Sequence, residues 1–193
     1  ADAVGRKVRE LIASGVSGRD IAIFYRVNSL SRALEEALIR HRIPYQVVRG
    51  VEFYNRKEVR DVLAYLKVLV NPADEIALLR IINTPARGIG KVTIEKTQEY
   101  AARCGIPLFD ALRNAGGIDG LGDSVKAKLL DFARMMEGFA REAEGKVAPL
   151  MEKVFSESGM ERSYKAAGAD GEAAIENIEE LISTAAVYDK QTE

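Results

Sequence analysis

The sequence predicts a mainly α-helical protein preceded by a partial α/β segment with a short parallel sheet. Two short apolar runs near the start, Ile21–Tyr25 and Tyr45–Val48, are typical of buried strands, and each follows a helical pattern. Downstream of the second run, apolar residues recur only at helical spacing. A tight double-glycine turn, Gly88–Gly90, separates two of these later helices. These observations predict two parts, residues 1–48 and residues 49–193.

The first part alternates helix and strand, which is the order that builds a parallel sheet. Both of its helices show one apolar face at helical spacing. The residues of these faces are Val4, Val8, Leu11 and Ile12, then Leu34, Leu38 and Ile39. Two strands are too few to bury both faces of a parallel sheet. We therefore expect residues 1–48 to be a piece of a larger α/β domain.

The second part is a succession of helices separated by proline and glycine. Its first long helix carries an apolar stripe and is stopped by Asn71-Pro72. The stripe consists of Val59, Val62, Leu63, Leu66, Leu69 and Val70. Further helices are expected at Ile76–Ile82, Lys91–Cys104, Pro107–Leu112 and Ser124–Glu144, then from Pro149 and around Ile175–Ile182.

The Gly88–Gly90 turn has the features of a helix-hairpin-helix element that binds phosphate. Glycine tolerates positive φ and lets another backbone come close. The free N–H groups at the start of the following helix, together with the helix dipole, favour an anionic oxygen. Arg87 and Lys91 add positive charge, and the Thr93 hydroxyl lies in the first helical turn. An ordinary glycine helix cap followed by a loop would give the same short pattern.

A weaker copy of this turn follows about thirty residues later, at Gly120-Leu121-Gly122-Asp123. A second hairpin of the same type would make a pseudo-symmetric clamp for phosphate. Asp123 argues against that function, because a carboxylate repels phosphate and serves well as the N-cap of a helix.

Composition and charge exclude several functional classes. Hydrophobic residues make up 47% and charged residues 30% of the 193 residues, and no apolar run approaches the roughly 20 residues of a membrane span. The net charge is −1, although basic residues outnumber acidic ones between Arg56 and Lys96. One cysteine, Cys104, rules out an internal disulfide framework and fits a reducing, cytoplasmic location, and no signal peptide is visible.

Groups that could support catalysis or metal binding are not evident in the sequence. No nucleophile–base pair, carboxylate dyad or metal-ligand cluster is visible. His41 stands between Arg40 and Arg42, which makes it a poor candidate for a metal ligand or a base. A self-standing enzyme is therefore not expected.

The segments FYRVNSLSRALEEAL and IPYQVVRGVEFYNRKEVRDVLAYLKVLVNPADEIALLRIINTPARGIG, in this order, resemble the UvrD/PcrA/Rep family of superfamily 1 DNA helicases. The resemblance extends from about Asp20 to Tyr100. In that family two RecA-like motor domains, 1A and 2A, each carry an inserted accessory subdomain. The resemblance implies that residues 1–48 are a partial RecA-like 2A segment and that residues 49–193 are the helical 2B accessory subdomain.

The ATPase motifs of such helicases are missing from this sequence. There is no GxxxxGK[ST] phosphate loop, no acidic motif of the type that holds Mg²⁺, and no late arginine-bearing motor motif. The resemblance implies that the parent protein is an ATP-driven 3′-to-5′ DNA helicase with ATP and Mg²⁺ as cofactors. This portion is expected to need no cofactor and to be inactive alone. Repair, replication-restart and plasmid-type helicases share these motifs.

The resemblance also assigns a contact to single-stranded DNA. Tyr25-Arg26-Val27-Asn28 is similar to the family's YRxN segment, whose arginine and asparagine face single-stranded DNA. Arg26 and Asn28 are therefore expected to bind a single strand. The pairing of a cation with an amide at a strand end fits this role. Capping of the following helix by Asn28 is the alternative.

Contacts to duplex DNA are expected at the glycine turn. Gly88, Ile89, Gly90 and Thr93 resemble the family's GIG-type hairpin, which grips the backbone of the duplex ahead of the fork. Arg87 and Lys91 would be supporting cations.

Two functions follow for this chain. The first is DNA binding without sequence preference, with duplex and single-stranded DNA and the other domains of the same helicase as partners. The second is a regulatory interaction module that docks on the motor domains or on a partner protein, with the acidic helical region Met151–Tyr188 as its surface. Binding that tracks salt, Arg87 and Lys91 would favour the first, and binding that tracks the C-terminal helices would favour the second.

Overall fold

The computed structural model describes residues 1–25, 30–47 and 50–191. These residues form helices joined by turns, and none of them is in a strand. The chain divides into two compact units, Ala1–Val51 (unit 1) and Glu52–Glu193 (unit 2). None of the described helices combines the length and the apolar character needed to cross a membrane.

Unit 1 contains two packed helices. They are α1 (Asp2–Ala13) and α2 (Leu30–Arg40), with a short 3₁₀ turn, η1 (Gly18–Asp20), between them in sequence. Val8, Leu38 and Ile43 form a small buried cluster, so the apolar faces predicted for both helices do meet. Ile21 and Ile23 pack against the same cluster.

The predicted parallel sheet is not observed. Ile21–Tyr25 and residues 45–47 lie beside no partner strand within the described part of the chain, and Val48 is outside it. A strand is held by hydrogen bonds to a neighbouring strand, and an apolar pattern alone supplies none. Phe24 therefore remains 93% exposed instead of being covered on a sheet face.

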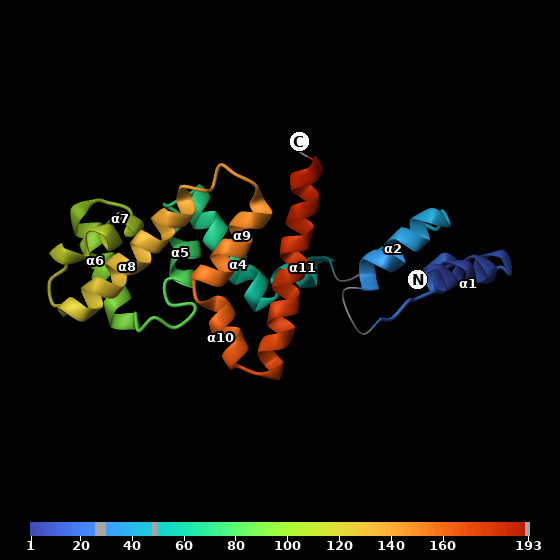
Figure 1. Cartoon of the computed structure of the whole chain (residues 1–193), viewed down its shortest axis with the longest axis horizontal. Helices are drawn as coiled ribbons and strands as arrows, with labels where there is room; N and C mark the ends of the chain where they lie inside the picture. The colour runs from blue at the N-terminus through green and yellow to red at the C-terminus, as the bar shows by residue number, and fades with distance from the viewer. Residues whose placement is uncertain (26–29, 48–49, 192–193) are drawn as a thin grey trace. The chain divides into compact units, whose positions relative to one another are not determined.

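The described residues of unit 2 form helices joined by turns and loops. Its helices are α3 (Gly50–Asn55, which begins in unit 1), α4 (Lys57–Val70), α5 (Glu75–Ile81), α6 (Lys91–Cys104), α7 (Leu108–Arg113), η2 (Ala115–Gly117), α8 (Asp123–Ala140), α9 (Val147–Glu157), α10 (Met160–Ala166) and α11 (Ala169–Gln191). Within this unit, α6, α7 and α8 gather at one end, while α9, α10 and α11 gather at the other (Figure 1).

Helix α4 lies at the centre of the unit 2 core. It contacts α5, α8, α9 and α11. Val59 and Val62 of the predicted apolar stripe are completely buried, and so is Tyr65, which was not assigned to the stripe. Leu63, Leu66 and Leu69 of the stripe are partly buried and pack against the core. Val70, at the end of the stripe, is instead 86% exposed. Because several helices pack on α4, this helix fixes their positions relative to one another.

Helix α11 returns to the core and closes it. Ile178 and Leu181 are buried against the other helices. Near its end, Asp189 accepts hydrogen bonds from the backbone N–H groups of Val147 and Ala148, at 2.9 Å each. These are the first amides of α9, so a side chain from α11 caps a neighbouring helix. The two amide donors lower the pKa of the Asp189 carboxyl below its usual value.

Candidate nucleic-acid interface

The Gly88–Gly90 hairpin joins α5 to α6 and exposes its two glycines while burying the residue between them. Gly88 has φ +71°, in the left-handed region that favours glycine. Gly90 has φ −84° and ψ 174° and is the N-cap of α6. Ile89 is completely buried. The hairpin is therefore anchored by its central side chain and presents main chain at the surface.

Asn83 closes the hairpin from within. Its side-chain oxygen accepts hydrogen bonds from the N–H of Arg87 at 2.7 Å and from the N–H of Ile89 at 3.2 Å. Asn83 was not among the residues predicted from the sequence. The available signal was an asparagine just before the turn, because asparagine side chains often bond to nearby backbone.

Arg87 points inward, toward the core. Its guanidinium donates to the carbonyl oxygens of Ile81 and Ser158, each at 2.9 Å, and to the Tyr65 hydroxyl at 2.6 Å. It also lies over the ring of Phe132, with 5.2 Å from the guanidinium carbon to the ring centroid. These contacts place the charge of Arg87 under the hairpin and tie the turn to α4 and to the end of α9.

The start of α6 provides backbone donors beside Gly90. The first helical hydrogen bond runs from the N–H of Ile94 to the carbonyl of Gly90, at 3.1 Å. The amides of Lys91, Val92 and Thr93 lie before the first helical bond, and the N-cap residue, Gly90, has no side chain that could accept from them. A Cβ on Gly90 would stand in open space. This arrangement suits an anionic oxygen at the helix N-terminus.

The other predicted contacts at this turn differ in exposure. Lys91 reaches outward, since its side chain is 88% exposed and its ion pair with Glu95 is long, at 3.7 Å. Thr93 is buried, and its carbonyl accepts a hydrogen bond of 2.7 Å from the Thr97 hydroxyl. The structure thus brings Gly88, Gly90 and Lys91 together at the surface.

The predicted single-strand contacts, Arg26 and Asn28, lie outside the described residues. Several basic residues of the middle region serve the fold. Arg80, for example, has its Nε 2.7 Å from the carboxylate of Asp61, which is only 2% exposed. The excess positive charge predicted between Arg56 and Lys96 is therefore only partly available to an outside partner.

A lysine from α8, Lys128, also lies at the hairpin and was not among the predicted residues. The ammonium of Lys128 lies beside the first hairpin, 2.6 Å from the position that a Cβ on Gly88 would occupy. Lys128 is thirty-eight positions beyond Gly90 in the sequence (128 − 90 = 38), so no local pattern links it to the turn.

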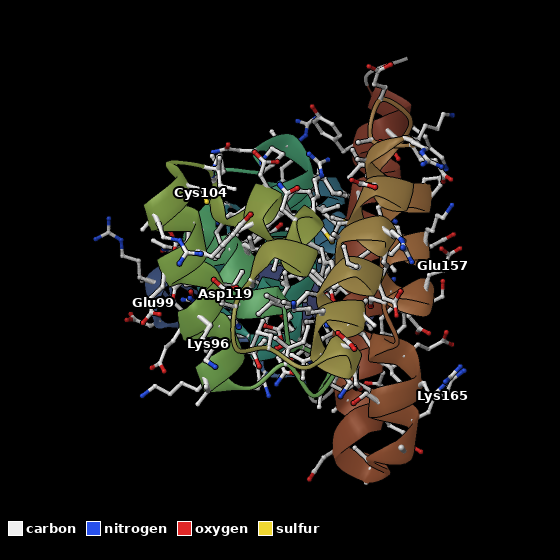
Figure 2. All side chains as sticks on the ribbon, turned by 90° about the vertical axis from the view of Figure 1, so that its left-hand side faces the viewer. Lys96, Glu99, Cys104, Asp119, Glu157 and Lys165 are labelled. Atoms are coloured by element: carbon white, nitrogen blue, oxygen red, sulfur yellow. The ribbon has the colours of Figure 1, made fainter. Side chains whose placement is uncertain are left out.

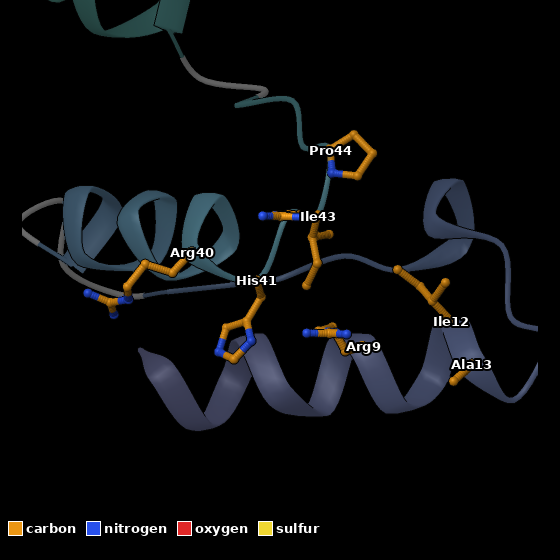
Figure 3. A pocket seen from close by; sticks show the side chains of 8 residues that line it. Arg9, Ile12, Ala13, Arg40, His41, Ile43 and Pro44 are labelled. Carbon is orange, nitrogen blue, oxygen red and sulfur yellow. The ribbon is translucent and has the colours of Figure 1, made fainter.

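Unit 1 contains a cavity of about 520 Å³ (Figure 3). Its lining residues are Arg9, Ile12, Ala13, Arg40, His41, Arg42, Ile43 and Pro44. His41 lies 3.0 Å from the carboxylate of Asp2, and this hydrogen bond lowers the pKa of the Asp2 carboxyl. The lining thus combines positive charge with apolar walls, and its histidine already has a structural partner.

Cofactor sites are not apparent in the described part of the chain. Its side chains form no group of three histidine, cysteine, aspartate or glutamate residues that could hold a metal ion. The sequence also contains no phosphate loop of the GxxxxGK[ST] type. The residues present therefore do not fit a site for ATP and Mg²⁺.

Comparison with known proteins connects this geometry to a family. Residues 1–120 match the family described as the UvrD-like helicase C-terminal domain. The whole chain is similar to the ATP-dependent DNA helicase PcrA of Staphylococcus aureus strain Mu50, with 36% identity over 194 aligned positions. The PcrA protein of Staphylococcus epidermidis strain RP62A is also 36% identical over the same length. In both comparisons the chain is covered completely and spans 26% of the relative's length.

The family match covers more than half of the chain, and it includes the Gly88–Gly90 hairpin and the start of α6. The similarity to PcrA extends over all the helices described above. The chain therefore belongs to the UvrD-like helicase C-terminal domain family.

Proposed function

We propose that this chain binds the sugar-phosphate backbone of duplex DNA through the Gly88–Gly90 hairpin, as part of a longer ATP-dependent 3′-to-5′ DNA helicase. The observation that carries the proposal is the exposed glycine pair beside the open amides at the start of α6. Lys91 adds an exposed positive charge at the same place. Family membership and the similarity to PcrA support the helicase assignment.

The chemistry of the hairpin favours recognition without sequence preference. Backbone amides bind phosphate oxygens, which are the same at every nucleotide. Ile89 is turned into the core, so it does not extend toward a base. Arg87 shapes the turn from beneath, and Thr93 contributes its backbone N–H more readily than its buried side chain.

Single-strand binding and ATP hydrolysis belong to the same proposal but rest on the family resemblance. Arg26 and Asn28 would contact the single strand at the edge of a 2A domain formed with residues of the longer protein. ATP and Mg²⁺ would be bound by motifs elsewhere in that protein. Residues 49–193 would form its 2B subdomain.

Duplex binding is tested by fluorescence anisotropy with a labelled duplex of arbitrary sequence, over a range of salt concentrations. With two to four phosphates contacted, the slope of log affinity against log salt should be about −2 to −4. A second duplex of unrelated sequence should give the same affinity. Binding that is insensitive to salt would contradict the proposal.

The role of the hairpin is tested by Gly90→Val. The backbone of Gly90 is already extended and its Cβ would meet nothing, so the variant should keep its helicity while its side chain obstructs the amides of α6. We expect duplex binding to be lost. Gly116→Val is the matched control, since Gly116 also faces open space but lies in η2. A Gly90→Val variant that binds duplex as well as the control would refute the hairpin contact.

A regulatory docking role is the alternative, and one observation favours it. Val70 and Ile76, on either side of the turn between α4 and α5, are each 86% exposed. If docking is the main function, substitution of these two residues by serine should weaken association with the motor domains and leave DNA binding unchanged. If DNA binding is the main function, the salt series above should respond to Lys91 and Gly90.

A further inference from the structure

The two glycine turns of unit 2 have nearly the same backbone. Gly88 and Gly120 have φ values of +71° and +70°. Gly90 and Gly122 are each the N-cap of a helix, with φ of −84° and −73° and no side-chain cap. Both pairs are separated by the same interval of 32 residues, since 120 − 88 = 32 and 122 − 90 = 32. The second turn is therefore a structural repeat of the first.

A lysine from each repeat reaches the turn of the other. Lys96 lies six positions after Gly90, and its ammonium donates a hydrogen bond of 2.6 Å to the carbonyl of Gly120. Lys128 lies six positions after Gly122, and its ammonium is the atom nearest to an added Cβ on Gly88, at 2.6 Å. The two lysines occupy equivalent positions of α6 and α8 and cross over between the repeats.

The crossed lysines differ in what they bind. Lys96 is engaged with a backbone carbonyl at the second turn. Lys128 has no hydrogen bond or ion pair within the described part of the chain, although its ammonium lies over the first turn. Gly88 and Gly90 are at most about 7 Å apart along the chain. An oxyanion at the start of α6 would therefore lie close to this ammonium, while Arg87 is used inside the core.

Charge on either side of the two turns is reversed. Arg87 and Lys91 flank the first glycine pair, whereas Asp119 and Asp123 occupy the equivalent positions around the second. The Asp119 side chain is 91% exposed, 3.6 Å from Arg103. Figure 2 shows Lys96 and Asp119 on one side of unit 2, with Lys165 well apart from them. Carboxylates at these positions repel a phosphate from the second turn.

We infer, on the basis of the proposed DNA-binding function, that the phosphate site at the first hairpin is composite. Its amides come from α6 and its ammonium from Lys128 on α8. The second hairpin binds no phosphate. Lys96 is a positioning residue, because its bond to Gly120 fixes the start of α8 to α6 and thereby holds Lys128 beside Gly88.

The test measures duplex affinity and its salt slope for Lys128→Gln, Lys96→Gln and Lys165→Gln in the 193-residue chain. Lys128→Gln should weaken binding about fivefold at fixed salt and make the slope shallower by about 0.9, because one phosphate contact is lost. Lys128→Arg should restore the slope. Lys96→Gln should weaken binding less than Lys128→Gln and change the slope by less than about 0.9, because Lys128 keeps its charge but is no longer held in position. Lys165→Gln, which removes a distant exposed charge on α10, should change neither.

Three outcomes separate failure of this inference from failure of the proposed function. If Lys128→Gln behaves like Lys165→Gln while Gly90→Val abolishes binding, the composite site is wrong and the hairpin contact stands. If Lys96→Gln also makes the slope shallower by about 0.9 and Asp123→Asn tightens binding, the second hairpin does bind phosphate. If the wild-type chain shows no salt-dependent binding, the proposed function fails. Circular dichroism melts verify that each variant is folded.

Discussion

The guanidinium of Arg87 donates a hydrogen bond of 2.6 Å to the hydroxyl of Tyr65, whose side chain is completely buried. The same hydroxyl donates to the carbonyl of Thr84 at 2.7 Å. Tyr65 belongs to the central helix α4, and Thr84 belongs to the segment that leads into the glycine hairpin. This relay couples the position of the hairpin to the core of unit 2.

Replacement of Arg87 by lysine should therefore destabilise the fold. A lysine ammonium cannot reach several acceptors in one plane, so carbonyl oxygens beneath the hairpin would lose their partners. The expected decrease in the free energy of unfolding is about 2–4 kcal/mol. Urea unfolding followed by circular dichroism measures it. Arg103→Lys is the control, because Arg103 also lies over a ring, that of Tyr100, but is exposed. Equal stability of the two variants would contradict an internal role for Arg87.

The two hairpin glycines should respond differently to alanine. Gly88→Ala places a Cβ at φ +71°, so it should lower the free energy of unfolding by about 1–2 kcal/mol and push the flexible end of Lys128 aside. Gly90→Ala has an extended backbone and open space, so its cost should stay below about 1 kcal/mol. Urea unfolding of the two variants side by side checks this order. A reversed order would contradict a left-handed backbone at Gly88 and an extended one at Gly90.

Removal of Arg80 should leave a buried charge on Asp61. Burial already raises the pKa of the Asp61 carboxyl, despite Arg80 beside it, and the second carboxylate oxygen has no hydrogen-bond partner among the described residues. Arg80→Met should therefore lower the free energy of unfolding by about 2–4 kcal/mol at pH 7. The double variant Asp61→Leu, Arg80→Met should recover much of this loss, because both charges are gone. A double variant less stable than Arg80→Met would rule out this explanation.

The loss of stability caused by Arg80→Met, measured against the wild type, should also become smaller in mild acid. A carboxyl whose pKa is higher in the folded state opposes folding above its unfolded pKa, and this cost disappears as the pH falls through the folded pKa. Urea midpoints measured between pH 7 and pH 4 should therefore converge for the two proteins. A gap that stays constant over this range would show that Asp61 is not the titrating group.

Asp189 should show the opposite pH dependence. Its pKa is lowered by the amides of Ala148 and Val147, so its contribution to stability is present above the unfolded pKa, near 3.8, and is lost as the pH falls through the folded pKa. Asp189→Asn should lower the urea midpoint at pH 7. The difference from the wild type should shrink below pH 4. Asp131→Asn, at an exposed position of α8, serves as control and should differ little from the wild type at either pH.

Local patterns predicted most helices of unit 2, although not α3 or α10 as separate helices. The stripe on α4 and the glycines around Ile89 are signals that lie within a few residues of one another. The structure buries Ile89, Val59 and Val62 in the core and packs Leu63, Leu66 and Leu69 against it. The predicted sheet in the first part was wrong for the described residues, because an apolar run shows a preference for burial but not the presence of a partner strand.

Local sequence patterns could not predict contacts between residues that are far apart in the sequence. The direction of Arg87 depends on Tyr65 and Ser158, which are 22 and 71 positions away. The position of Arg87 beside a glycine turn therefore suggested a cation that points outward, whereas its side chain points inward. Alignment of the two glycine pairs shows in the sequence that Lys96 and Lys128 follow them at equal distance, but not that Lys128 lies at the first turn. The repeat was visible, but the crossing of its lysines depends on how the fold brings the two turns together.

Under the proposed DNA-binding function, the burial of Ile89 has a consequence for movement along DNA. Because the one large side chain of this turn is buried in the core, the tip of the turn exposes peptide groups. Peptide groups would engage each successive nucleotide with equal strength, so no stretch of the polymer would retain the protein longer than another. Such a contact suits a protein that advances stepwise along DNA of any sequence rather than one that binds a specific site.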